Sequence, residues 1–298
     1  MAYFGGKSKV AALVWERFGD VPNFVEPFFG SGAVLLARPH AARVETVNDM
    51  DAFLTNFWRA VAADPDGVAE WADSPVNELD LHAKHHWLKA QDIAKMRSDP
   101  DFYDVKTAGW WLWGISCWIG DGWCKAESGK RPHLGDAGNG GRPHLGRDQG
   151  SHAKFRSEGI YDYMRQLSKR FRRVRVCCGD WSRVCGDSVT IFHGTTGVFL
   201  DPPYFSPDRA DCYNFDCREL PKRVAKWAIE KGDDPRMRIA LCGYYGDYNM
   251  PESWDCVAWK AGGGYGNQNE KNDNAGKERI WFSKFCLKPL AQRSLFGE

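Results

Sequence analysis

Short apolar runs alternate with helical patterns at the start of the chain, and this alternation constrains the fold more than any other feature. Apolar residues recur at helical spacing over residues 7–18, and a buried strand is predicted at Phe24-Val25. A helix over 31–37, a strand over 44–47 and a helix over 52–62 follow. Strands that alternate with helices in this way predict a parallel sheet with helices on its faces.

The alternation stops near Asp64 and resumes near Val174. The predicted elements after this point are strands over 174–177, 197–200, 238–242, 255–259 and 279–285, and a helix over 218–231. We therefore expect one sheet domain, residues 1–62 and 172–298, interrupted by an inserted domain, residues 63–171. The insert is rich in tryptophan, which favours a small, mostly helical core over base stacking.

Charge is distributed unevenly along the 298 residues. The net charge is +1, yet residues 125–175 hold 13 Lys and Arg against 5 Asp and Glu, so the rest of the chain is acidic. A basic segment on an acidic body predicts a surface that faces a polyanion. For residues 165–175 a solvated helix face explains the same charges equally well.

Composition excludes several classes of protein. No apolar run approaches the roughly 18 residues of a membrane-spanning helix, and the first seven residues are too polar for a signal peptide. Ten cysteines are too sparse for a disulfide framework, so we expect a reducing, cytoplasmic compartment. Cys117 with Cys124, and Cys177 with Cys178, lack partners at metal-site spacing, and we interpret them as free thiols rather than metal ligands.

A glycine-rich segment, residues 128–150, contains the sequence Arg-Pro-His-Leu-Gly twice, beginning at Arg131 and at Arg142. Two copies cannot build a repeat fold, so the segment is interpreted as a mobile loop that presents cations. It could lie along a phosphate backbone, and a tolerated surface insertion is an equal alternative. A second glycine-rich loop is predicted over 262–276.

Two features of the predicted sheet indicate a cofactor that contains a nucleoside. The sequence Glu-Pro-Phe-Phe-Gly-Ser-Gly at 26–32 joins a strand to a helix, and glycines there let backbone N–H groups approach a ligand. Asp49 ends the next strand, about 20 residues later, where an acid can accept hydrogen bonds from ribose hydroxyls. This spacing does not identify the cofactor.

The sequence Asp201-Pro202-Pro203-Tyr204 follows the strand over 197–200. Ligands of open α/β sheets bind at the carboxyl ends of strands, and the prolines hold the backbone rigid. A carboxylate, the Pro202 carbonyl and the Tyr204 ring suit a planar base that carries an amino group. A proline-rich turn beside a core tyrosine is the structural alternative.

In four motifs the chain resembles a Dam-like adenine-specific DNA methyltransferase, a family that uses S-adenosylmethionine. The motifs stand in the family's order: Tyr-Phe-Gly-Gly-Lys at 3–7, the cofactor turn at 26–32, Asn-Asp at 48–49 and the tetrapeptide at 201–204. The resemblance covers both ends of the sheet domain and does not cover the insert. It implies a Rossmann-like methyltransferase sheet, with residues 63–171 in the place of a target-recognition domain.

The resemblance also implies roles for individual residues. Tyr3 and Lys7 are expected beside the methionine end of the cofactor, and Asp49 at its ribose. Asp180 resembles the acid that meets the cofactor's adenine, although a helix N-cap explains it as well. Asp201 is expected where the sulfonium and the target amine meet. The residues expected to line the cofactor turn are Phe28, Gly30 and Gly32.

The activity that follows is methyl transfer from S-adenosylmethionine to the exocyclic amine of adenine in double-stranded DNA, without a metal and after base flipping. Arg209 and Tyr213, in the loop after the tetrapeptide, are expected to contact DNA. The alternatives are the exocyclic amine of cytosine, RNA or a protein amide as acceptor, and a non-catalytic DNA-binding protein. The resemblance favours a monomer, and the recognised DNA sequence cannot be read from the chain.

Overall fold

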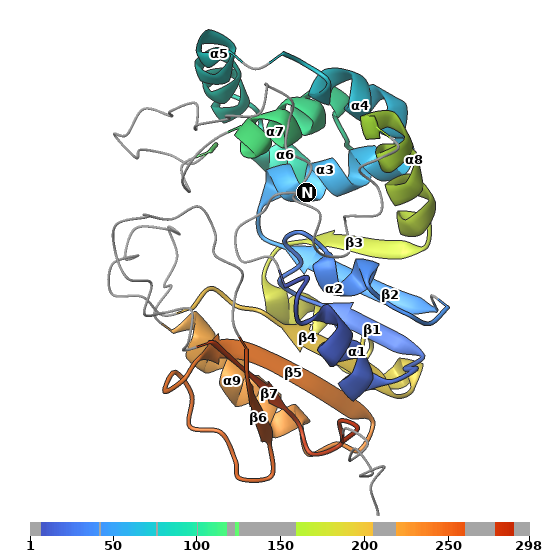
Figure 1. The fold of residues 1–298 in the computed structure, drawn as a ribbon, viewed down its shortest axis with the longest axis vertical. Coiled ribbons are helices and arrows are strands. Elements are labelled where there is room, and N and C mark those ends of the chain that lie inside the picture. Colours follow the sequence, from blue (N-terminus) through green and yellow to red (C-terminus); the bar gives the residue numbers. More distant parts are fainter. Residues whose placement is uncertain are drawn as a thin grey trace, which may run out of the picture.

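Seven strands form one mixed sheet in the computed structural model, which describes residues 7–41, 43–75, 77–99, 101–117, 123–124, 159–204, 219–259 and 278–288. The strand order is β3-β2-β1-β4-β5-β7-β6, and Figure 1 shows it edge to edge. The strands are β1 (Asn23–Glu26), β2 (Val44–Asp49), β3 (Val174–Cys178), β4 (Thr196–Leu200), β5 (Met237–Tyr244), β6 (Asp255–Ala258) and β7 (Glu278–Phe282).

Helices cover both faces of this sheet because successive strand residues point to opposite sides. Phe24 belongs to the buried core that includes α1 and α3, whereas its neighbour Val25 belongs to the core that includes α9. Phe199 and Val198 of β4 divide in the same way. The helices next to the sheet are α1 (Ala11–Phe18), α2 (Ala33–Leu36), α3 (Ala52–Ala63) and α9 (Leu220–Lys231), with short 3-10 turns η2 (Trp181–Val184) and η3 (Ile191–His193).

The described part of residues 63–171 is helical and packs beyond the β3 edge of the sheet (Figure 1). Its core is continuous with that of the sheet domain, since the ring of Phe171 stacks on Trp58 of α3 with centroids 4.4 Å apart. The helices of this region are α4 (Pro65–Ala72), α5 (Glu78–Lys89), α6 (Ile93–Ser98), α7 (Val105–Cys117) and α8 (Gly159–Phe171).

Polar side chains start several of these helices. Asp51 caps α3 by accepting hydrogen bonds from the backbone N–H groups of Phe53 and Leu54. Asp64 caps α4 in the same manner, and Pro65 occupies the first turn, where its missing N–H costs nothing. These caps explain why the chain turns sharply between α3 and α4.

The expected α/β, Rossmann-like methyltransferase sheet with a mostly helical insert is confirmed, and every strand predicted from the sequence is present. Three details differ. The helix expected over 7–18 begins at Ala11, and the one expected over 31–37 spans only α2, because Gly32 adopts a left-handed φ of 67°. Strand β7 runs antiparallel to β5 and β6, in a sheet whose other pairs are parallel. The division at residues 62 and 172 stays a prediction.

The sheet reverses its order of strands between β1 and β4. Strand β1 pairs with β2 on one side and with β4 on the other, and the chain then proceeds outward in both directions. Loops at the carboxyl ends of two such strands diverge, which opens a crevice for ligands at this edge. Glu26, Asp49 and Asp201 stand at the ends of β1, β2 and β4, so the predicted motifs converge here.

Candidate functional site

The turn after β1 approaches its neighbours closely. Gly30 and Gly32 have φ angles of 48° and 67°, which residues with side chains rarely adopt. A Cβ atom on Gly32 would lie 2.6 Å from the ring of Phe29, and the Phe29 N–H donates to the carbonyl of Asn48 at 3.0 Å. The turn is therefore fixed against the end of β2.

Asp49 is tied to this turn. Its Oδ2 accepts a hydrogen bond from the N–H of Gly30 at 3.0 Å, and its Oδ1 accepts from the N–H of Asp51 at 2.9 Å. Burial raises the pKa of the carboxyl to about 6, although these N–H groups oppose the shift. Each oxygen keeps a lone pair, so the carboxylate can accept from two neighbouring hydroxyls.

Asp180 follows β3 and serves as an N-cap. Its side chain accepts hydrogen bonds from the N–H and the hydroxyl of Ser182 at the start of η2. Burial alone would raise its pKa, but these bonds outweigh burial and lower it. The next residue, Trp181, stacks on Phe28 with centroids 6.2 Å apart. Phe28 and Asp180 therefore lie near each other beside the turn.

Asp201 forms the centre of a compact corner at the end of β4. The Nζ atom of Lys7 lies 2.9 Å from its Oδ2, and the hydroxyl of Tyr204 donates to its Oδ1 at 3.1 Å. Lys7 is only 5% exposed. Burial works to lower the pKa of Lys7, yet the combined effect of the charge and hydrogen bond of Asp201, with smaller contributions from Cys242 and Glu278, raises it. The ion pair with Asp201 therefore holds Lys7 as an ammonium and gives Asp201 a counter-charge in this structure.

The ring of Tyr204 packs inside this corner. It meets Tyr244 of β5 edge to face at 4.7 Å between centroids, and the Lys7 ammonium lies 5.1 Å from the Tyr204 ring centroid. Pro202 is buried and Pro203 is exposed. The expected stacking of Tyr204 on a base and the acceptor role of the Pro202 carbonyl stay predictions.

Three further polar residues surround the corner: Glu26, Glu278 and Trp259. Glu26 is the first residue of the motif at 26–32, whereas no sequence motif includes Glu278 or Trp259. Glu26 ends β1, is 2% exposed and has an Oε2 atom without a hydrogen-bond partner among the described residues. Burial raises the pKa of its carboxyl well above the usual value. Glu278 and Trp259 stand at the ends of β7 and β6. For Glu26, the sequence signals are its place at the end of a buried strand and at the start of the motif at 26–32.

Several expected site residues lie outside the described residues. They are Tyr3, Arg131, Arg142, Arg209 and Tyr213, together with the glycine-rich segments 128–150 and 262–276.

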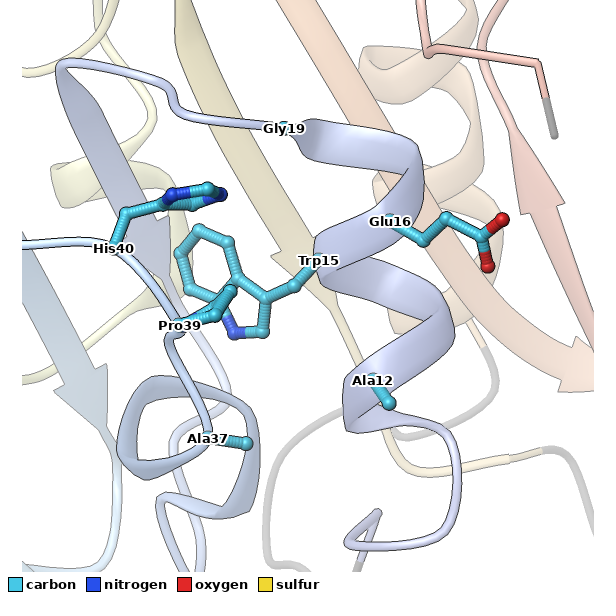
Figure 2. Close-up of a pocket in the computed structure, with 7 residues that line it drawn as sticks. All are labelled: Ala12, Trp15, Glu16, Gly19, Ala37, Pro39 and His40. Carbon is cyan, nitrogen blue, oxygen red and sulfur yellow. The ribbon is translucent and has the colours of Figure 1, made fainter. Parts of the chain in front are cut away.

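One cavity of about 440 Å³ lies between α1 and the chain that leads from α2 to β2 (Figure 2). Trp15, Pro39 and His40 are among its lining residues, and no expected site residue lines it. At the carboxyl edge, Lys7 and Tyr204 contact Asp201 directly. The described residues contain no group of three potential metal-ligand side chains and no helix long and apolar enough to cross a bilayer.

Residues 3–104 match the model of the family described as D12 class N6 adenine-specific DNA methyltransferase. The matched range includes the cofactor turn and Asp49. It ends before β4, so the tetrapeptide at 201–204 lies outside it. No curated protein matches the chain. The family match indicates an adenine DNA methyltransferase, in agreement with the sheet and with the order of the motifs.

Proposed function

We propose that the chain transfers a methyl group from S-adenosylmethionine to the N6 amine of adenine, after the adenine has been flipped out of double-stranded DNA. The observation that carries this proposal is the position of the Lys7–Asp201–Tyr204 corner. It lies at the end of β4, next to the point where the sheet reverses its order of strands.

The residues at this edge fit the proposed cofactor. Asp49 has lone pairs for two ribose hydroxyls, and the N–H of Gly30 holds this carboxylate beside the turn. Phe28 and Asp180 lie together on the β3 side, where an adenine ring and its amine would find an aromatic face and an acceptor. When bound, the cofactor supplies an electrophilic methyl group.

Asp201 is the proposed catalytic residue. The lone pair of an adenine amine is delocalised into the ring, so the amine is a weak nucleophile. A hydrogen bond from the amine to Asp201, supported by the Pro202 carbonyl, favours a pyramidal nitrogen whose lone pair is available. The remaining contribution is alignment of the amine with the methyl group.

Base flipping supplies access to this corner. The N6 atom cannot be reached inside a stacked duplex, and extrusion costs a few kcal/mol. Tyr204 would recover part of this cost by stacking. We assign target recognition to residues 63–171, with Arg131, Arg142, Arg209 and Tyr213 as DNA contacts, and we propose a monomeric enzyme.

Asp201→Asn tests the proposal, because asparagine keeps the shape of the side chain and an acceptor for Lys7. We expect methyl transfer to duplex DNA to fall by about 100-fold or more, while circular dichroism and cofactor binding stay unchanged. Asp187→Asn is the matched control, since Asp187 pairs with Lys231 at 2.7 Å away from the carboxyl edge. Wild-type rates in Asp201→Asn, or labelled methyl groups on cytosine instead of adenine, would contradict the proposal.

A further inference from the structure

A row of three side chains crosses the sheet next to the catalytic corner. Tyr244 of β5 stands opposite Glu278 of β7, and the N–H of Trp259 donates to the carbonyl of Glu278 at 3.2 Å. Residues directly opposite each other in antiparallel strands project from the same face. Tyr244, Glu278 and Trp259 therefore share one face, and it is the face that carries Tyr204 and Lys7.

Two atoms of this row are buried without a hydrogen-bond partner among the described residues: Trp259 Nε1 and Glu278 Oε2. Buried polar groups are nearly always paired, and an orphaned one is costly, so such atoms point to a missing polar partner. Lys7 connects them to the corner, since its Nζ lies 5.4 Å from the Trp259 ring centroid and 2.9 Å from Asp201. An indole N–H is a donor only, whereas a carboxyl oxygen accepts in either protonation state.

The topology indicates which ligand would meet these atoms. Under the proposed function, the cofactor would lie on the β1 side of β4, at the reversal of strand order. Strands β5, β7 and β6 lie on the opposite side of β4. Because the methyl group passes the Asp201 corner from the cofactor to the amine, the acceptor base has to lie on the β5 side, beside Trp259 and Glu278.

We infer that Trp259 reads the flipped adenine by donating its indole N–H to ring nitrogen N1, while Glu278 places a second carboxyl oxygen beside Asp201 on the amine side of the same edge. This inference rests on the proposed function. The Watson–Crick edge of adenine presents the amine, a donor, beside N1, an acceptor. A protein acceptor beside a protein donor complements this edge. The Lys7 ammonium, an N–H donor to Asp201, holds the place of the amine in this structure and withdraws when the base enters.

The test compares duplexes in which the target adenine is replaced by 1-deazaadenine, which lacks N1, or by 7-deazaadenine, which keeps it. For the wild-type enzyme we expect kcat/KM to fall about 10-fold or more with 1-deazaadenine and to change little with 7-deazaadenine. Trp259→Phe should not discriminate between the two analogues, since phenylalanine has no N–H group to donate to N1. Trp254→Phe, a buried tryptophan packed on Gly232 beneath α9, should keep the discrimination.

The outcomes separate the two proposals. If the wild-type enzyme methylates no adenine at all, the proposed function fails. If it methylates adenine but treats both analogues alike, or if Trp259→Phe discriminates as well as the wild type, the inference about Trp259 is wrong and the proposed function stands. The wild-type comparison decides against the inference even if Trp259→Phe does not fold.

Discussion

Replacing Gly32 by alanine should destabilise the protein by about 2–5 kcal/mol. The left-handed backbone at φ 67° costs a residue with a side chain about 1–2 kcal/mol. The new Cβ would also lie 2.6 Å from the ring of Phe29, which is 3% exposed. Trp58 and Phe171 hold that ring, with centroids 5.2 and 5.8 Å away, so it cannot move aside and overpacking adds about 1–3 kcal/mol.

Urea unfolding followed by circular dichroism measures this change as a lower midpoint at an unchanged slope. Gly246→Ala is the control, because Gly246 also has a positive φ, 96°, but no atom lies within 4 Å of its added Cβ. It should show the backbone cost alone. If Gly32→Ala is no less stable than Gly246→Ala, Phe29 is not fixed and the argument for a rigid cofactor turn is refuted.

Two further predictions concern charged groups. Arg170→Ala should destabilise the protein by about 1–3 kcal/mol in urea unfolding, because the Oε2 atom of Glu45, a residue 1% exposed, loses its guanidinium donor while Arg38 still donates to Oε1 at 3.1 Å. Arg165 lies on the same helix as Arg170 and forms an exposed pair with Asp66, so Arg165→Ala should change little, and equal effects would contradict this reasoning. The pKa of Asp49 is about 6 in the folded state, against an ordinary value of 3.8. The folded state therefore binds more protons than the unfolded state between these pH values, and the protein loses stability through Asp49 as pH rises from about 4 to about 6. The free energy of unfolding of Asp49→Asn should therefore rise relative to that of the wild type as pH increases across this window, and the difference should stay constant above it. A difference that does not change with pH would contradict the raised pKa of Asp49.

The strands could be predicted because their apolar residues are consecutive and buried on both faces. Val25 and Phe24, for example, belong to different cores. The direction of β7 could not be predicted, because an apolar pattern carries no information about whether a strand runs parallel or antiparallel. The start of the helix expected over 31–37 could not be predicted, because the left-handed φ of Gly32 and its close packing on the Phe29 ring depend on the tertiary structure.

The acids at the strand ends could be predicted to lie together, because the carboxyl ends of parallel strands lie at the same edge of a sheet. The structure brings Asp49 to the glycine turn and Asp201 to Lys7, although 194 positions separate the latter pair along the chain. Glu278 and Trp259 could not be found in this way, since only the antiparallel pairing of β6 with β7 places them beside Asp201.

The stacking of Phe171 on Trp58 has a consequence for engineering new target preferences. Helix α8 closes the inserted region, yet its last residue supports the Phe29 ring beneath the cofactor turn. A chimera that exchanges the whole of residues 63–171 would remove this support along with the proposed recognition elements. Exchange points before Gly159 keep α8 together with its own sheet. Such chimeras should therefore keep the wild-type affinity for the methyl donor.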